Sequence, residues 1–263
     1  MEVYVPTWNS ERTLNTCLSA IKKAVPNHNI TIIDRNSTDN TQTIAQNHGC
    51  TIISENLNLG QARTRAINLA KDEWFIMVDS DTYLCPNWFN EVWALKEKLI
   101  QTDPHVGIIQ GESVPMLEPY HSYVLYAYAQ ARSHYPAKNV KRLLTSCILL
   151  RKEAVCNFKA DAPVYEDWLI GKHLRRKGYN FYVAQTQSAH DGPANMKMLA
   201  DHAKWGGAGL RLYYKMPLWK LLGALFIIPL FRTPFKWKRL VWHLQWNWLL
   251  GWWMASKYKE LKR

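Results

Sequence analysis

Short apolar runs alternate with amphipathic stretches through the first third of the chain. Strand-like runs, rich in β-branched and aromatic residues, cover residues 3–5, 30–33, 51–53 and 74–78. Helical patterns lie between them, in the spacing of Leu14, Leu18 and Ile21 and in residues 41–47 and 62–70. Strands that alternate with helices predict an α/β fold, in which a parallel sheet carries helices on both faces.

Candidate ligand-binding residues follow three of these runs. They are Pro6 and Thr7 after the first run, Asp34 after the second, and Asp79 and Asp81 after the fourth. Open parallel sheets bind ligands beyond the carboxyl ends of their strands. The pattern therefore predicts a ligand site at this edge of the sheet, and its carboxylates favour a site that is assisted by a cation.

The tripeptide Asp79-Ser80-Asp81 can place two carboxylates on one hard divalent cation. Mg²⁺ typically takes one or two carboxylates together with substrate phosphates, although an ordinary acidic turn after a strand is the simpler alternative. Asp34 can accept a hydrogen bond from a ribose hydroxyl or a base N–H. The polar residues that follow Asp34, including Asp39, are explained in part by turn formation and helix capping.

Glu166 and Asp167 begin a helical pattern that ends at Gly178. Acidic residues in a first helical turn are favoured by the helix dipole, which is one explanation for the pair. The other is a general base held on a rigid element. His190 follows a strand-like run over residues 181–184. A single histidine is commonly structural, but imidazole is also a common metal ligand, so His190 is a candidate ligand.

Five segments, in this order, resemble the family 2 glycosyltransferases. They are VYVPTWN at residues 3–9, IDRNSTDNT at 33–41, NLG at 58–60, VDSD at 78–81 and ED at 166–167. The resemblance covers residues 1–202. It implies the GT-A fold, a Rossmann-like and mostly parallel sheet flanked by helices. It also implies an inverting transfer of a sugar from a nucleotide-diphosphate sugar.

The resemblance implies a nucleotide site built from residues of the first two strands and the helix that follows the third. Pro6, Thr7 and Asp34 are expected to line the nucleoside pocket. Arg65 is expected to approach the nucleotide, together with Asp79.

The resemblance implies metal-dependent chemistry at the other candidate residues. Asp79 and Asp81 match the family's DXD motif, in which Asp81 is expected to be the firmer ligand of Mn²⁺ or Mg²⁺, and His190 is a further candidate ligand. Asp167 matches the position of the catalytic base, with Glu166 beside it. A cation offsets the charge that develops on a diphosphate leaving group, and the base accepts the proton of the acceptor hydroxyl.

Two departures from the family pattern concern specificity. Arg35 stands where the family often has a second acid, so recognition of the base is expected to differ. Residues 144–147 stand where a glycine-rich patch is common, so contacts to the sugar and the acceptor are expected to differ as well.

Charge and tryptophan gather at the end of the chain. Residues 203–263 contain twelve basic residues and a single acid, so they carry +11 of the formal net charge of +12. They also contain eight of the 13 tryptophans. This shift predicts two segments, a catalytic domain over residues 1–202 and a basic, Trp-rich helical segment over residues 203–263.

The tail has two apolar runs, at residues 221–231 and 240–254. The first is too short to span a bilayer, which takes about 20 apolar residues. Along the second, a narrow polar stripe is predicted from the spacing of Lys236, Arg239, His243, Asn247 and Gly251. The pattern predicts an amphipathic helix at an anionic membrane surface. A helix packed on the catalytic domain, a homodimer contact and a re-entrant hairpin are the alternatives.

A membrane-bound enzyme suggests a lipid-linked acceptor, because such an acceptor presents its hydroxyl or phosphate at the headgroup level. The five cysteines form no CxxC pair, and no signal peptide is recognisable at the start of the sequence. Both features favour a peripheral or monotopic protein on the cytoplasmic side of the cell membrane.

Two other functions compete with this hypothesis. A nucleotidyltransferase acting on a sugar phosphate could share the nucleotide-binding half, but no glycine-rich phosphate loop follows the first strand. A module for single-stranded nucleic acid could use Trp and Lys in the tail. The long apolar blocks of the tail disfavour that function, and no nucleic-acid partner is expected.

Overall fold

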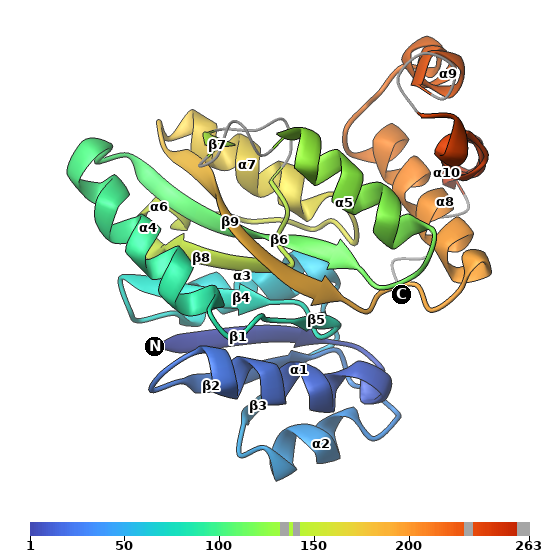
Figure 1. The fold of residues 1–263 in the computed structure, drawn as a ribbon. Coiled ribbons are helices and arrows are strands. Elements are labelled where there is room, and N and C mark those ends of the chain that lie inside the picture. Colours follow the sequence, from blue (N-terminus) through green and yellow to red (C-terminus); the bar gives the residue numbers. More distant parts are fainter. Residues whose placement is uncertain (132–136, 139–142, 229–233, 257–263) are drawn as a thin grey trace.

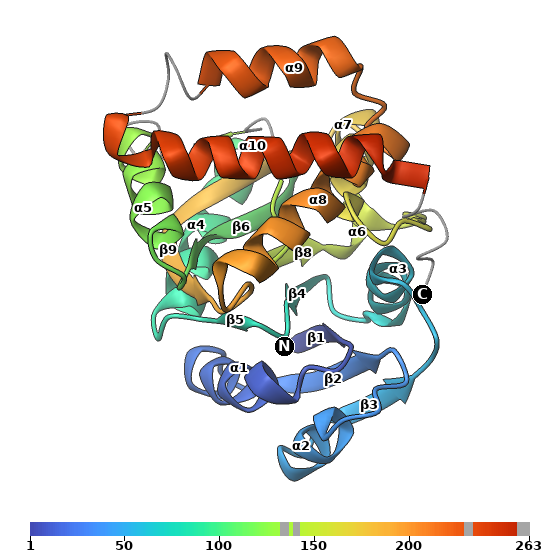
Figure 2. The same ribbon diagram turned by 90° about the vertical axis from the view of Figure 1, so that its right-hand side faces the viewer.

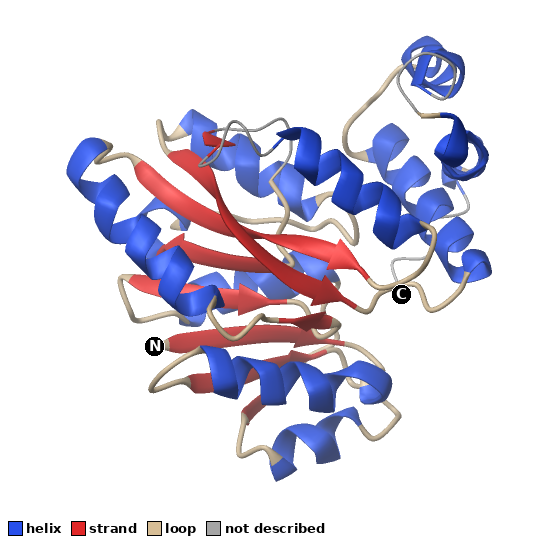
Figure 3. Cartoon of the chain, viewed as in Figure 1, coloured by secondary structure: helices blue, strands red, loops and turns tan. Residues whose placement is uncertain are grey.

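The computed structural model describes residues 1–131, 137–138, 143–228 and 234–256. In this part of the chain one sheet carries helices on both faces, and further helices lie at one end of the molecule (Figures 1 and 3). The strands are β1 (Glu2–Thr7), β2 (Asn29–Asp34), β3 (Thr51–Ser54), β4 (Trp74–Val78), β5 (Thr82–Tyr83), β6 (Val106–Pro115), β7 (Ala137–Lys138), β8 (Cys147–Arg151) and β9 (Asn180–His190). The helices are α1 (Glu11–Ala24), α2 (Thr41–Asn47), α3 (Leu59–Leu69), α4 (Trp88–Thr102), α5 (Tyr120–Ala131), α6 (Lys152–Val155), α7 (Glu166–Arg176), α8 (Met196–Leu212), α9 (Leu218–Ile227), the 3-10 turn η3 (Phe235–Trp237) and α10 (Lys238–Trp253).

The sheet is parallel in the first half of the chain and mixed in the second. Its order is β3-β2-β1-β4-β8-β6-β9-β5, and β7 pairs with β9. β1 is parallel to β2 and β4, and β2 is parallel to β3, as the alternating pattern predicts. The prediction of a mostly parallel sheet is wrong beyond β4. There β8 runs antiparallel to β4 and β6, while β9 is parallel to β6 and antiparallel to β5 and β7. Apolar content reports burial on both faces and carries no information on strand direction.

Two apolar cores lie on opposite faces of the sheet, because successive residues of a strand point to opposite sides. In β4, Trp74, Ile76 and Val78 face the core that contains residues of α1 and α4. Phe75 and Met77 face the core that contains residues of α3, α6 and α7. Residues 74–78 are all apolar because both faces of β4 are buried.

The C-terminal helices pack on the rest of the protein. Figure 2 shows α10 lying across α8, with α9 beside α10 on the outer side. Val164 and Tyr165, which precede α7, share an apolar cluster with Leu210 of α8 and Leu221 of α9. The predicted boundary between residues 202 and 203 falls inside α8, so the change in composition does not coincide with the end of a helix or strand.

Two glycines allow α8 and α10 to approach closely. A Cβ on Gly207 of α8 would collide with the backbone of Trp248, and a Cβ on Gly251 of α10 would collide with the backbone of Lys204. Small residues at such crossings let two helix backbones come into contact. This contact determines which side of α10 is buried.

The predicted polar stripe of the tail is wrong for the second half of α10. Asn247 and Gly251 are buried, because this side of the helix faces α8. The exposed side instead carries Trp242, Trp246 and Trp253, which are 48%, 54% and 69% exposed. No helix in the described ranges is long and apolar enough to cross a membrane.

Candidate active site

The carboxyl ends of β1, β2 and β4 meet at one edge of the sheet, as expected for parallel neighbours. Thr7 pairs in register with Asp34, and Asp79 follows directly after β4. The backbone N–H of Asp79 donates to the carbonyl of Ser146 at 2.9 Å, which joins this edge to the start of β8. Two of the candidate acids, Asp34 and Asp79, therefore lie at the predicted edge.

Arg63 of α3 connects acids from two distant parts of the chain. Its side chain is 1% exposed. Its Nη2 donates to Asp79 Oδ1 at 2.6 Å, and its Nε donates to Glu166 Oε1 at 3.2 Å. Its Nη1 donates to the carbonyl of Thr145 at 3.3 Å. The planar guanidinium offers donors in several directions, so one side chain holds the β4 edge and the start of α7 together.

Glu166 is a buried carboxyl whose pKa is raised from its ordinary value of 4.5 to about 7. Burial is the largest cause, because it disfavours the charged form. The positive charge of Arg63 opposes this effect, while the negative charges of Asp167 and Asp79 add to it. Thr145 Oγ1 also donates to Glu166 Oε1, at 3.4 Å. The result is an acid that titrates near neutral pH.

Asp167 lies beside Glu166 in the first turn of α7 and is 5% exposed. Its Oδ1 accepts a hydrogen bond from the backbone N–H of Trp168 at 2.6 Å. Tyr165 precedes the helix in a left-handed conformation, with φ of 64°. A bulky residue seldom adopts this conformation, and such backbone strain is concentrated at functional sites. The turn at Tyr165 sets the direction in which α7 presents both acids.

Asp81 and His190 form a second pair at the same edge. His190 Nε2 lies 3.3 Å from Asp81 Oδ1, and the adjacent Thr82 pairs with His190 between β5 and β9. Burial by itself would raise the pKa of Asp81, but the contact with His190 holds it below its ordinary value. Burial would lower the pKa of His190, but the hydrogen bond and charge of Asp81 raise it. The structure therefore brings these two predicted ligands together.

Asp81 and His190 fit a cation that takes its remaining ligands from a substrate. In the described part of the chain no group of three or more His, Cys, Asp or Glu side chains could hold a metal by itself. Mg²⁺ is usually held by one or two carboxylates together with substrate phosphates and water, which matches a site with few protein ligands. Asp79 turns one of its oxygens to Arg63, so Asp81 is the better placed carboxylate of the two.

Asp34 is fully buried, and protein donors occupy both of its oxygens. They are Thr7 Oγ1 at 2.8 Å, the backbone N–H and hydroxyl of Ser37 at 2.8 and 2.6 Å, and Gln42 Nε2 at 2.8 Å. Pro6 lies one residue earlier in β1 and pairs with Ile33. A ribose hydroxyl that contacts Asp34 would have to compete with these donors.

Arg65 forms its ion pair outside the cluster of Asp79, Asp81 and Glu166. It lies on the solvent side of α3, where it forms an ion pair with Glu55 at 3.0 Å. Arg63, which sequence reasoning missed, takes the place beside Asp79. The helical spacing could have indicated Arg63. It lies three and four residues before Ala66 and Ile67, and so on the same, buried side of α3.

Comparison with solved structures identifies the fold. Glucosyl-3-phosphoglycerate synthase from Mycobacterium tuberculosis, solved with Mn²⁺, uridine diphosphate and glucosyl-3-phosphoglycerate, has a TM-score of 0.58 at 17% sequence identity, covering 82% of this chain and 80% of that chain. S. aureus TarS 1-349 has a TM-score of 0.55 at 13% identity, covering 100% of this chain and 91% of that chain. These similarities show an open, curled α/β sheet flanked by helices, as in GT-A glycosyltransferases.

Comparison with protein families confirms the resemblance noted from the sequence. No curated protein matches the chain. Residues 2–158 match the family described as Glycosyl transferase family 2. This match covers more than half of the chain and includes β1 to β8, Arg63, Asp79 and Asp81. The protein is therefore a glycosyltransferase that belongs to glycosyl transferase family 2.

Proposed function

We propose that this enzyme moves a sugar from a nucleoside-diphosphate sugar to a lipid-linked acceptor at a membrane surface, with inversion at the anomeric carbon. The observation that carries the transferase chemistry is the convergence of two pairs of titratable side chains on one sheet edge. Asp79 and Glu166 share Arg63, and Asp81 lies against His190. Solved neighbours with uridine diphosphate and Mn²⁺ or Mg²⁺ support a nucleotide donor and a divalent cation.

Each residue of the site has a part in the proposed mechanism. Asp81 and His190 would hold a divalent cation, which would offset the negative charge on the diphosphate leaving group. Asp167 accepts the proton of the acceptor hydroxyl as that oxygen attacks the anomeric carbon. Arg63 holds Glu166 and Asp79 in fixed positions. It thereby keeps the start of α7, where Asp167 lies, at a fixed position relative to the donor site.

The exposed side of the tail supports action at a membrane. Besides the tryptophans of α10, Trp219 of α9 and Phe235 of η3 are 69% and 89% exposed. The side chains of Lys220 and Lys236 lie over neighbouring Trp rings, with Nζ 5.3 and 4.0 Å from the ring centroids. Exposed aromatic side chains together with basic residues suit an anionic membrane interface.

The proposal of a lipid-linked acceptor rests on this exposed surface of the tail. An enzyme held at the headgroup level meets an acceptor anchored there at a high effective concentration. The proposed location is the cytoplasmic side of the cell membrane, whose anionic lipids attract basic segments.

A titration with metal and nucleotide tests the chemistry. The wild-type protein is expected to bind uridine diphosphate more tightly with Mn²⁺ than with EDTA, measured by calorimetry, and Asp81→Ala is expected to lose that difference. Donor turnover at the full rate in EDTA would contradict a role for the cation.

The same assays separate binding from transfer at Glu166 and Asp167. Asp167→Asn is expected to bind the donor normally and to lose transfer by about 10²–10⁴-fold, which is the typical effect of removing a general base. A variant that turns over normally, while Glu166→Gln is inactive, would assign the base to Glu166 instead.

A further inference from the structure

The segment that follows β9 connects the candidate metal ligands with the start of α1. Asp191 comes directly after His190, and its side chain is 23% exposed. Arg12, in the first turn of α1, donates from Nη1 to Asp191 Oδ1 at 2.8 Å. Its Nη2 donates to the carbonyls of Asp191 and Gly192 at 2.6 and 3.0 Å. One guanidinium therefore holds a carboxylate and two consecutive carbonyls from a distant part of the chain.

Asp191 has two further partners, and both belong to the segment that carries Asp81. Tyr83 of β5 donates its hydroxyl to Asp191 Oδ2 at 2.8 Å. The backbone N–H of Asp191 donates to the carbonyl of Asp81 at 2.8 Å. Both carboxylate oxygens and the N–H of Asp191 are therefore bound, by groups from α1 and from residues 81–83.

The same segment supports the imidazole of His190. A Cβ on Gly192 would lie 3.0 Å from His190 Cε1 and 3.3 Å from Nε2, so the backbone of Gly192 lies against the ring. On the other hand, Nε2 of the ring lies 3.3 Å from Asp81 Oδ1. Because Arg12 holds the carbonyl of Gly192, it also fixes the backbone on which the ring rests.

An ordinary surface ion pair is the simpler explanation of the contact between Arg12 and Asp191. The side chain of Arg12 is 49% exposed, and exposed ion pairs contribute little to stability. An ion pair alone, however, does not account for the two carbonyls that Arg12 binds or for the hydroxyl of Tyr83 on the second oxygen. Groups that orient a ligating histidine typically change metal affinity by about 10–100-fold when they are removed. Metal affinity therefore separates the two explanations.

We propose that Asp191 is a positioning residue, which fixes the imidazole of His190 beside Asp81 for a divalent cation. Arg12 and Tyr83 hold Asp191 in this role. The inference rests on the proposed function, in which His190 and Asp81 ligate the cation. Because α1 follows β1 directly in the chain, the same contacts also fix the position of His190 relative to the end of β1.

The affinity for uridine diphosphate, measured by calorimetry with Mn²⁺ and again with EDTA, gives the contribution of the cation as a ratio. Arg12→Gln and Tyr83→Phe are each expected to lower this ratio by about tenfold, at the lower end of the usual range for groups that orient a metal ligand. Tyr83→Phe removes a single hydroxyl and so provides the test if Arg12→Gln fails to fold. A merely structural role would lower both affinities equally and leave the ratio unchanged, which would overturn the proposal.

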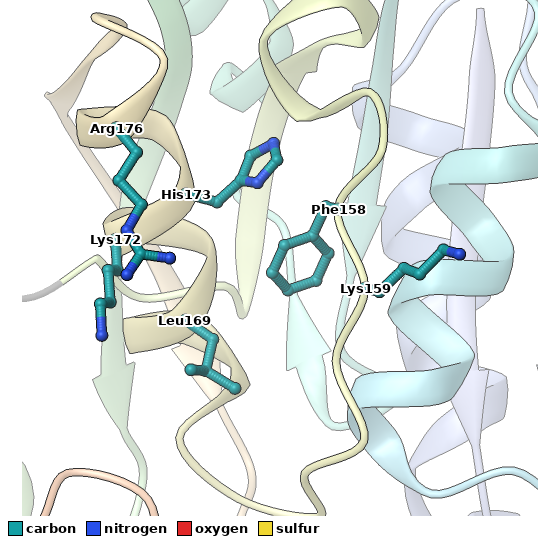
Figure 4. A pocket seen from close by; sticks show the side chains of 6 residues that line it. All are labelled: Phe158, Lys159, Leu169, Lys172, His173 and Arg176. Atoms are coloured by element: carbon teal, nitrogen blue, oxygen red, sulfur yellow. The ribbon is translucent and has the colours of Figure 1, made fainter.

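Two arginines outside the site serve as matched controls. Arg151 lies at the edge of the sheet where β4 begins, donates to the carbonyl of Pro104 at 3.0 Å and pairs with Glu73 and Glu153. Arg176 of α7 lines a cavity of about 150 Å³ (Figure 4), and none of the described residues that line it belongs to the candidate active site. Arg151→Gln and Arg176→Gln each remove one positive charge and should keep the wild-type ratio. An equal decrease in these controls would show a general effect of charge and would overturn the proposal.

A double variant shows whether the effect passes through His190. In the His190→Asn background, Arg12→Gln should lower the ratio no further, because the ligand that it positions is gone. Fully additive effects would overturn the proposal. If His190→Asn lowers the ratio but Arg12→Gln and Tyr83→Phe do not, only this inference is wrong. If His190→Asn itself leaves the ratio unchanged, His190 is not a ligand, and the metal site of the proposed function is wrong as well.

Discussion

Arg63 is a buried cation that three hydrogen bonds hold in place. It carries a positive charge in the interior and donates to two carboxylates and one carbonyl. Removing one partner of a buried charge network leaves the others uncompensated, which costs more than the contact itself contributes. Arg65, two residues away, is half-buried and pairs with the half-buried Glu55. The two arginines therefore form a matched pair for experiment.

Arg63→Met is expected to lower the free energy of unfolding by about 3 kcal/mol or more, because Asp79 and Glu166 lose their shared cation. Arg65→Met is expected to change it by less than about 0.5 kcal/mol, as is usual for a surface side chain. Urea unfolding of both variants measures the difference. Equal effects would show that the buried network contributes little.

Glu166 makes stability depend on pH in a defined direction. Between its ordinary pKa of 4.5 and the folded value of about 7, the folded protein binds a proton that the unfolded chain has released. The free energy of unfolding therefore falls as the pH rises through this window. Relative to Glu166→Gln, the wild type should lose on the order of 3 kcal/mol across it. Urea unfolding at several pH values tests this, and parallel curves for the two proteins would contradict it.

Among the elements, α7 presents the two acids of the candidate site. Glu166 and Asp167 lie in its first turn. The ring of Tyr165, at the start of the helix, packs so closely on Gly209 of α8 that a Cβ there would collide with it. The position of the acids therefore depends on a helix that the composition assigns in part to the tail.

The crossing of α8 and α10 predicts different effects for two adjacent glycines. Gly207→Ala should destabilise the protein by about 1–3 kcal/mol, because its Cβ overlaps the backbone of Trp248. Gly206→Ala should be neutral or stabilising, since its Cβ meets Trp248 only at an ordinary 3.4 Å and alanine favours the helix. Thermal unfolding of the two variants measures this. Two similar melting temperatures would mean that the crossing can relax.

At the scale of the whole molecule, the candidate active site and the exposed tryptophans of α10 are joined through α8. α8 follows β9, and β9 ends at His190 of the candidate active site (Figure 1). A chain cut at residue 202 would lose most of α8 and would expose Val164 and Tyr165. Substitutions on the exposed side of α10 are therefore a sharper test of membrane binding than truncation.

Trp242→Ser and Trp246→Ser are each expected to weaken flotation with anionic vesicles by roughly tenfold, because burying a large apolar side chain contributes about 1.5–3 kcal/mol. Trp8→Ser removes an exposed tryptophan that lies after β1, away from the tail, and should float as the wild type does. A wild-type protein that ignores vesicles but dimerises in light scattering would assign this surface to a homodimer contact.

The local sequence determined the first half of the fold and the position of the acids along the chain. α2 and β4 have the predicted bounds, because caps and apolar periodicity act over a few residues. Asp34 and Asp79 lie at the carboxyl ends of parallel strands for the same reason. The family match confirms the glycosyltransferase predicted from motif order.

Only the tertiary structure decided which residues meet. The direction of β8, the contact of Arg63 with Asp79, and the burial of Asn247 and Gly251 all depend on segments far apart in the sequence. Local periodicity shows that a side of a helix is apolar or small, but it does not show what packs there. In α10 the close approach of α8 determined the buried side. The tryptophans were left facing outward, so the pattern alone could not predict the exposed surface.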